Sequence, residues 1–154
     1  MLTEPTIVET SAQASAVIRL TIPRSEIQNS MGPAFQELMG TIAAQGIAPT
    51  GAAYSHHFRF DPDVFDFEVG VPVSAPVQAS GRVVPGELPA ATVARTYYQG
   101  PYEGLGPAWG EFGEWLASHG YDTQQSLWES YVEGPGTQPD PTKWRTELNR
   151  PLNK

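Results

Sequence analysis

The chain has 154 residues, with a hydrophobic fraction of 40%, a charged fraction of 17% and a net charge of −8 at pH 7. These values are typical of a globular protein, and the lack of a basic patch argues against direct binding of nucleic acid. The absence of cysteine excludes disulfides and zinc–thiolate sites, and no apolar run is long enough to span a membrane. Because the N-terminus does not resemble a signal peptide, we expect a cytoplasmic protein.

The first half of the chain predicts one strand–helix–strand–strand module. Its elements are expected at residues 15–23 (strand), 31–47 (helix), 51–60 and 64–73 (strands). Pro33 suits the first turn of the helix, and Gly46 suits a left-handed C-cap. Residues 1–13 are expected to form a loose arm or an extra edge strand.

The second half repeats this module, with strands expected at residues 91–98, 126–134 and 143–152 and a helix at 105–121. The helix segments "MGPAFQELMGTIAAQGI" and "LGPAWGEFGEWLASHGY" align without a gap, so that Phe35 corresponds to Trp109, both expected in the helix–sheet core. We interpret this as an internal duplication. The prediction is a single domain of residues 1–154, with module one at about 15–77, a linker at about 78–90 and module two at about 91–154.

The two modules predict an α+β fold. A mainly antiparallel sheet would carry the helices on one face, and the duplicated strand–helix–strand–strand modules would be related by pseudo-two-fold symmetry. The face without helices would leave a groove, which is the expected ligand cleft.

The candidate site begins with "SLWESYVEGP", a predicted strand in which Glu129 lies between two aromatic residues. Side chains alternate between the faces of a strand, so Glu129 and Tyr131 share one face and Trp128 lies on the other. The corresponding polar face of the first module carries Ser55 and His57. We expect the face with Trp128 to pack on the helices and the Glu129 face to line the cleft. The alternative is a glutamate that faces water.

The chemistry of such a glutamate allows two functions. A carboxylate that is partly buried among aromatic rings has a raised pKa unless a cation pairs with it, so the site would suit a cationic aromatic ligand. A protonated acid could instead donate a proton, or the carboxylate could activate water. Glu129 and Tyr131 would therefore be catalytic residues only if the protein is an enzyme.

Five further side chains are candidates for the cleft, and two of them are alternatives to each other. Tyr98 and Tyr102 flank the segment "QGP" and would either line the cleft or support a turn. Trp144 and Glu147 lie on opposite faces of the last strand, so only one of them can face the cleft. We favour Trp144 as the ligand contact, whereas strict repeat symmetry favours Glu147. His57 is expected as an additional polar ligand contact.

No metal ion and no cofactor are expected. His56 and His57 are adjacent on a predicted strand and point to opposite faces, so they cannot bind one ion together. The sequence contains no P-loop, no dinucleotide-binding fingerprint and no Gly-x-Ser-x-Gly motif.

The duplicated plan, together with "YYQGPYEGL", "ESYVEGP" and "WRTELNRPL", resembles the GyrI-like domain, also called the AraC-type effector-binding domain. The resemblance extends from about Ser15 over nearly the whole chain. It implies a cleft between two modules that binds small molecules, often hydrophobic cations, between aromatic rings and a buried glutamate. The glutamate of the family lies in an "E-x-Y" context, which Glu129 and Tyr131 match. The family's "x-G-P-Y" segment falls on Tyr98 and Tyr102.

The resemblance leaves three functions open. The leading one is cytoplasmic binding of a small aromatic or cationic organic molecule, for sensing or sequestration, by a stand-alone domain of the multidrug-binding type. The second is hydrolysis of cyclopropane-bearing or other electrophilic natural products by Glu129 and Tyr131. The third is partnership with a topoisomerase, as its inhibitor. The fold alone does not choose among them.

Overall fold

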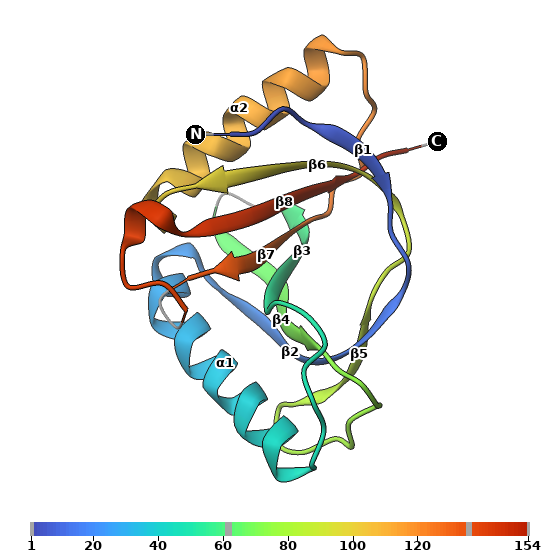
Figure 1. Ribbon diagram of the computed structural model, residues 1–154, viewed down its shortest axis with the longest axis vertical. Coiled ribbons are helices and arrows are strands. Elements are labelled where there is room, and N and C mark those ends of the chain that lie inside the picture. Colours follow the sequence, from blue (N-terminus) through green and yellow to red (C-terminus); the bar gives the residue numbers. More distant parts are fainter. Residues whose placement is uncertain (1, 61–62, 135–136, 154) are drawn as a thin grey trace. The chain divides into compact units, whose positions relative to one another are not determined.

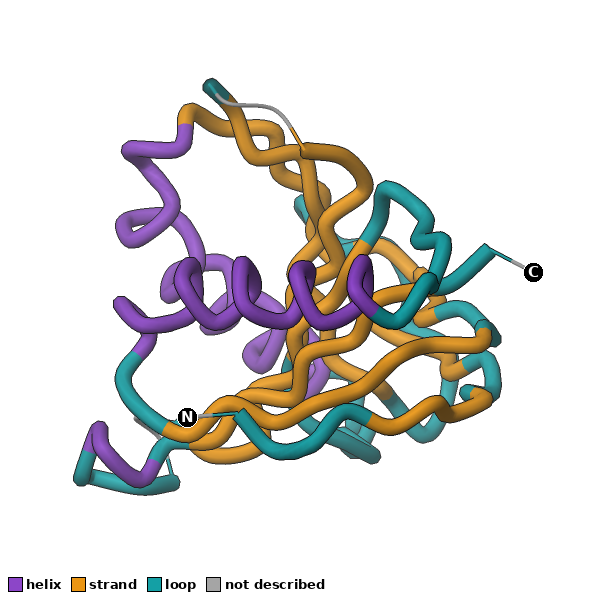
Figure 2. The backbone as a smooth tube through the Cα atoms, turned by 90° about the horizontal axis from the view of Figure 1, so that it is seen from above, coloured by secondary structure: helices purple, strands orange, loops and turns teal. Residues whose placement is uncertain are grey.

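The structure is a computed structural model that describes residues 2–60, 63–134 and 137–153. The chain forms two compact units: the first is Ser11–Ala90, and the second combines Met1–Thr10 with Ala91–Lys154. In the described residues each unit has one long helix and four strands, which Figure 1 labels and Figure 2 colours by type. No helix in this described part of the chain is long and apolar enough to cross a membrane.

The first unit is an antiparallel sheet that carries helix α1. Its strands are β2 (Gln13–Pro23), β3 (Tyr54–Phe60), β4 (Val64–Pro72) and β5 (Val84–Leu88), and α1 (Ile27–Ala44) follows the short 3₁₀ turn η1 (Arg24–Glu26). The strands are ordered β3-β4-β2-β5, and all three neighbouring pairs are antiparallel. This half therefore has the strand–helix–strand–strand plan that its sequence predicts.

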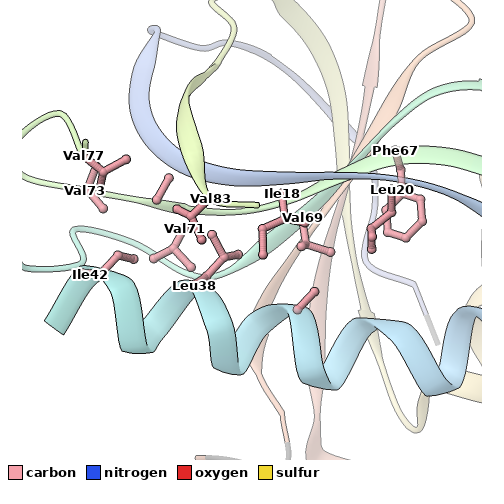
Figure 3. Packing of buried hydrophobic residues seen from close by; sticks show 12 residues of the cluster. Ile18, Leu20, Leu38, Ile42, Phe67, Val69, Val71, Val73, Val77 and Val83 are labelled. Carbon is pink, nitrogen blue, oxygen red and sulfur yellow. The ribbon is translucent and has the colours of Figure 1, made fainter. Parts of the chain in front are cut away.

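Apolar side chains of α1 and of the sheet form the core of the first unit. Ala34, Leu38 and Ile42 recur every four residues on one side of α1, and each is at most 1% exposed. They pack with Ile18 of β2 and Val69 of β4, as Figure 3 shows for the labelled side chains. The helix therefore lies on the face of β4 that carries Val69.

The second unit repeats this arrangement around helix α2 (Leu105–Ser118). Its strands are β1 (Thr6–Glu9), β6 (Thr92–Gln99), β7 (Leu127–Glu133) and β8 (Arg145–Pro151), and its 3₁₀ turns are η2 (Tyr102–Gly104) and η3 (Pro141–Lys143). The strands are ordered β1-β6-β8-β7, again with antiparallel pairs. Phe112 and Leu116 of α2 pack with Leu148 of β8 in the core.

Equivalent strands take equivalent places in the two units. In each unit the last strand of the module, β4 or β8, lies between the first strand, β2 or β6, and the strand that follows the helix, β3 or β7. The predicted α+β class with mainly antiparallel pairing is confirmed. The shared strand order is also what an internal duplication predicts.

In each unit one of the two outer strands, β5 or β1, comes from a segment outside the repeat. β1 precedes β2 in the chain but pairs with β6, where Thr6 lies opposite Arg95. β5 precedes β6 but pairs with β2, where Gln13 lies opposite Leu88. The N-terminal arm is thus an edge strand, which is one of the two alternatives that the sequence left open. The segment predicted as a linker, at about 78–90, contains a strand as well.

Both helices end as the sequence predicts. Gly46 and Gly120 have positive φ angles of 69° and 74°. The residue after each glycine donates its N–H back to the helix, from Ile47 to the Ile42 carbonyl and from Tyr121 to the Leu116 carbonyl. This is the Schellman arrangement that a left-handed glycine permits.

The start of α1 differs from the prediction. The helix begins at Ile27, so Pro33 lies in its interior and not in its first turn. Proline has no N–H to donate, and the helix therefore lacks one backbone hydrogen bond at this point. In α2, which begins at Leu105, the corresponding Pro107 does lie in the first turn, where an N–H would have no partner within the helix.

Candidate functional site

Strand β7 presents Glu129 and Tyr131 on the face that carries helix α2. In the antiparallel ladder Glu129 lies opposite Leu148, and Tyr131 lies opposite Thr146. Directly opposed residues share a face of the sheet, and Leu148 belongs to the core under α2. The expectation that the Glu129 face points away from the helices is therefore wrong.

The polarity of β7 was misleading because both faces of the strand are buried. Trp128 is 1% exposed and Glu129 is 9% exposed, although their side chains point to opposite sides. An alternation of apolar and polar residues identifies the core face only where the polar face meets water. The first unit has the same arrangement, since the fully buried Ser55 lies opposite Val69, whose side chain packs under α1.

The carboxylate of Glu129 accepts two hydrogen bonds from aromatic side chains. Trp109 on α2 donates from Nε1 to Oε2 over 2.6 Å, and the Tyr131 hydroxyl donates to Oε1 over 2.8 Å. Hydrogen bonds to an ionised acceptor are stronger than those between neutral groups. Together they orient the carboxylate between the helix and the strand.

Two more aromatic rings extend this arrangement. The ring of Tyr102, in η2, lies 5.7 Å from the Tyr131 ring and 4.7 Å from the Trp144 ring. Trp144 Nε1 donates a hydrogen bond to the Gln138 carbonyl over 2.7 Å. The resulting set, called the Glu129 cluster below, consists of Glu129, Trp109, Tyr131, Tyr102 and Trp144.

The Glu129 cluster surrounds a carboxylate with weakly polar rings. Burial, followed by the nearby charge of Glu129, raises the pKa of Tyr102 above its usual 10.0, so this phenol is neutral at physiological pH. The faces of aromatic rings carry negative electrostatic potential. A carboxylate and several ring faces together suit a ligand that carries positive charge on an apolar body.

Tyr98 is not brought to the Glu129 cluster. Its side chain lies in the core under α2, is 7% exposed, and donates its hydroxyl to the Pro101 carbonyl over 2.9 Å. A Cβ atom at Gly104 would collide with this hydroxyl, so a larger residue there would force the Tyr98 ring to shift. Tyr98 thus shapes the turn that leads into α2, whereas Tyr102 and Trp144, two other predicted ligand contacts, do lie in the cluster.

Glu147 belongs to a separate network on the opposite face of the same sheet. Its carboxylate accepts hydrogen bonds from the Tyr97 hydroxyl at 2.9 Å and from Asn149 Nδ2 at 3.0 Å. Arg95 Nε lies 3.3 Å from its Oε1. Of the two residues between which the sequence left the choice open, Trp144 lies with Glu129 and Glu147 does not.

His57 lies in the first unit, on the strand that corresponds to β7. Its Nε2 is 3.2 Å from Ser55 Oγ, and its ring stacks on Phe67 with centroids 4.8 Å apart. Burial, followed by the charges of His56 and Arg24, lowers the pKa of His57 to about 4, so the ring is neutral at pH 7. Across residues 2–60, 63–134 and 137–153, no group of three or more His, Cys, Asp or Glu could hold a metal ion.

Trp109 is the member of the cluster that sequence reasoning assigned only to the core. A signal for its second role was present in the repeat. Where the second module has Trp109 and Glu129, the first has Phe35 and Ser55. Tryptophan can donate a hydrogen bond and phenylalanine cannot. The module that has the indole donor is therefore also the module that has the carboxylate acceptor.

A surface pocket of about 280 Å³ lies elsewhere in the second unit. It is lined by residues 2–5 and, on α2, by Glu111, Phe112 and Trp115. None of the five residues of the Glu129 cluster lines it. Glu129 is 9% exposed, so a ligand that reaches its carboxylate would have to move neighbouring side chains.

The chain matches the sequence model of one protein family. That model describes a GyrI-like small molecule binding domain, and the match covers residues 3–152. No curated protein matches the chain in sequence.

Several solved structures have the same fold. The C-terminal domain of EcmrR is 23% identical with a TM-score of 0.86, and the comparison covers 98% of both chains. In the complex of EcmrR with DNA, the chain spans 57% of the EcmrR chain. SAV2435 bound to tetraphenylphosphonium is 14% identical with a TM-score of 0.71, over 98% of this chain and 94% of that one. A hydrolase encoded by lin2189 from Listeria innocua is 12% identical with a TM-score of 0.70, over 97% and 92%.

Proposed function

This chain belongs to the family of GyrI-like small molecule binding domains, and we propose that it binds a cationic aromatic organic molecule at Glu129. The observation that carries the proposal is the position of one nearly buried carboxylate among the rings of Trp109, Tyr131, Tyr102 and Trp144. The biological role would be sensing or sequestration of that molecule.

The energetics favour an exchange of partners at the carboxylate. Glu129 accepts hydrogen bonds from two neutral donors, Trp109 and Tyr131. A cation would bring a full charge into the same low-dielectric surroundings, where charge pairs are stronger than in water. Each ring face that the cation contacts would add about 0.5–2 kcal/mol of cation–π attraction. A neutral aromatic ligand would gain only the apolar contacts.

Access to the carboxylate requires side chains to move, because Glu129 is 9% exposed. Tyr102 and Trp144 lie in short connecting segments and not within a strand or α-helix. Loop-borne side chains move at lower cost than those of regular elements. We therefore propose that these two rings part to admit the ligand.

The test uses tetraphenylphosphonium, the ligand with which SAV2435 was solved. Titration calorimetry on the wild type should give saturable binding at one site. Glu129→Gln should weaken this binding by about 10- to 100-fold, the scale of a lost charged interaction. The matched control is Glu147→Gln, which makes the same change on the opposite face of the sheet and should leave the affinity within about two-fold. Equal losses in both variants, or no binding to the wild type, would refute the proposal.

A hydrolase remains a second candidate because of one contact, the hydrogen bond from the Tyr131 hydroxyl to Glu129 Oε1. A carboxylate could direct water at the electrophilic carbon, while the phenol donates a hydrogen bond to the substrate atom on which negative charge develops as the bond to that carbon breaks. The substrate would be a cyclopropane-bearing or other electrophilic natural product. The Listeria innocua structure described as a hydrolase has the same fold, which supports this candidate by analogy alone.

A further inference from the structure

The side-chain hydroxyl of Thr146, in the central strand β8, is buried without a hydrogen bond. Thr146 is 0% exposed, and among the described residues its Oγ1 has no hydrogen-bond partner. Buried hydroxyls are normally paired, and an exception calls for a physical explanation. A binding site is one such explanation, because a ligand can supply the missing partner.

Thr96 is a natural reference for Thr146, because both threonines are fully buried in the same sheet. Thr96 on β6 lies opposite Leu148, two residues along β8 from Thr146, so the two side chains share the face that carries α2. The Thr96 hydroxyl donates to the Thr3 carbonyl over 2.6 Å. The sheet thus holds one satisfied and one unsatisfied threonine hydroxyl in similar surroundings.

Thr146 lies on β8, next to the β7 residues of the Glu129 cluster and on the same face of the sheet. It lies directly opposite Tyr131, and Trp144 immediately precedes β8, two residues before Thr146 in the chain. The ring of Tyr102 contacts both of these neighbours. A ligand that displaced Tyr102 would therefore meet Tyr131 and Trp144, and Thr146 lies directly across the ladder from Tyr131.

The neighbouring tyrosine hydroxyls do not serve as partners for Thr146. Tyr131 donates its hydroxyl to Glu129, and Tyr98, which lies opposite Thr146 on the other side, donates to the Pro101 carbonyl. The Thr146 hydroxyl can both donate and accept. Of these three hydroxyl groups, that of Thr146 is the one without a hydrogen-bond partner in the described part of the chain, so it is available to an incoming molecule.

We infer that Thr146 is a specificity-determining residue, whose hydroxyl hydrogen-bonds a hydroxyl or carbonyl group of the ligand. The inference rests on the proposed function of the Glu129 site. Glu129 lies opposite Leu148, so Thr146 is its diagonal cross-strand neighbour, at a backbone spacing of about 7–8 Å. A disubstituted aromatic ring, measured together with its two substituents, spans a distance of this order. The ligand class is accordingly an aromatic cation with a hydrogen-bonding group about one ring away from its charge.

The experiment compares tetraphenylphosphonium with the ortho, meta and para isomers of (hydroxyphenyl)triphenylphosphonium, which have the same charge and nearly the same shape. At least one isomer should bind the wild type about 5- to 20-fold more tightly than the parent, the gain expected from one additional hydrogen bond. Thr146→Val removes the hydroxyl at constant volume. It should abolish this preference, so that no isomer binds the variant more tightly than tetraphenylphosphonium does. Thr146→Ser should retain the preference.

Stability provides a second readout, with Thr96→Val as the matched control. Thr96→Val breaks an existing hydrogen bond and should lower Tm without changing the ratio of the two affinities. Thr146→Val breaks none, so the unliganded variant should melt at the wild-type temperature or above it. A Tm loss in Thr146→Val as large as that in Thr96→Val would overturn the inference, because it would mean that the hydroxyl is already paired.

If tetraphenylphosphonium binds in a Glu129-dependent manner but no isomer is preferred, the inference fails alone. If no phosphonium cation binds, it fails together with the proposed function.

Discussion

Trp109 Nε1 donates a hydrogen bond of 2.6 Å to Glu129 Oε2, and this bond joins helix α2 directly to strand β7. The Trp109 ring also lies 5.8 Å from that of Phe112, which is fully buried in the core. One side chain thus supports both the packing of α2 and the orientation of the candidate carboxylate. A ligand that draws Glu129 toward itself acts on α2 through the same bond.

Replacing Trp109 by phenylalanine separates these two roles. Trp109→Phe keeps an aromatic ring but removes the donor, so the free energy of unfolding should fall by about 1–3 kcal/mol, the cost of leaving a charged acceptor short of a partner. Tetraphenylphosphonium should bind about 3- to 10-fold more tightly, because the cation no longer competes with the indole for Glu129. Urea denaturation and calorimetry measure the two effects.

Trp115→Phe is the control for this variant. Trp115 lies on the same helix, and its ring stacks on those of His119 and Tyr121. The control should not tighten cation binding. Weaker binding to Trp109→Phe would contradict the expectation and would mean that the indole itself contacts the ligand.

Helix α2 contains glycines that its packing does not require. Around both Gly110 and Gly113 an added Cβ atom would meet nothing within 4 Å. Gly110→Ala and Gly113→Ala should therefore each stabilise the protein by about 0.5–1 kcal/mol through helix propensity, which thermal denaturation can measure. Gly120→Ala is the opposite control: with φ at 74° an alanine would be strained, and the variant should be less stable. Loss of stability in all three variants would show that α2 needs its glycines for another reason.

The sequence predicted the order of elements well, because the relevant signals are local and occur twice. The helix-terminal glycines Gly46 and Gly120 and the alternating strands lie at matching places in the two copies. Edge strands β1 and β5 were harder to predict. Each pairs with a strand that is not its neighbour in the chain, and local sequence does not specify such a partner.

For the candidate site, the sequence indicated several of the residues but not the face of the sheet on which they lie. The contacts among Glu129, Tyr131, Tyr102 and Trp144 bring together residues that the sequence had singled out. Their face was predicted wrongly because both sides of β7 are buried, so polarity does not indicate where the helix lies. The hydrogen-bond deficit of Thr146 had no sequence signal, because a buried threonine is paired or unpaired according to its neighbours alone.

The buried histidines predict a dependence of stability on pH. Burial, followed by neighbouring charges, lowers the pKa of His57 from 6.5 to about 4, and His56 is shifted in the same way. Between these pH values the unfolded chain binds protons that the folded chain does not, so stability should fall as the pH drops from about 6.5 to about 4. The loss should be on the order of 1–3 kcal/mol per histidine.

Chemical denaturation at a series of pH values tests this prediction. Glu68 also titrates in the acid range, because burial raises its pKa, so the informative quantity is the difference between a variant and the wild type. His57→Gln removes one imidazole, and its stability relative to the wild type should improve as the pH falls from about 6.5 to about 4. A difference that does not vary with pH would mean that His57 titrates at the same pH in the folded and unfolded chains.

The second unit offers a matched pair of tyrosines that can separate a binding protein from an enzyme. Tyr131 donates its hydroxyl to Glu129 over 2.8 Å, and Tyr97 donates to Glu147 over 2.9 Å on the opposite face of the sheet. Changing either tyrosine to phenylalanine removes one hydroxyl and one hydrogen bond to a carboxylate. The structural cost of the two substitutions should therefore be similar, about 1–3 kcal/mol each.

Their functional effects should differ according to what the Glu129 site does. If the protein is a binder that uses ring faces, Tyr131→Phe should keep tetraphenylphosphonium affinity within a few-fold, because phenylalanine retains the ring and Glu129 retains its charge. If the protein is a hydrolase, Tyr131→Phe should lower turnover of a cyclopropane-bearing substrate by about 10²- to 10⁴-fold with little change in substrate binding, whereas Tyr97→Phe should not. We expect the binder outcome. Multiple turnovers by the wild type that are lost in both Glu129→Gln and Tyr131→Phe, but not in Tyr97→Phe, would establish the hydrolase instead.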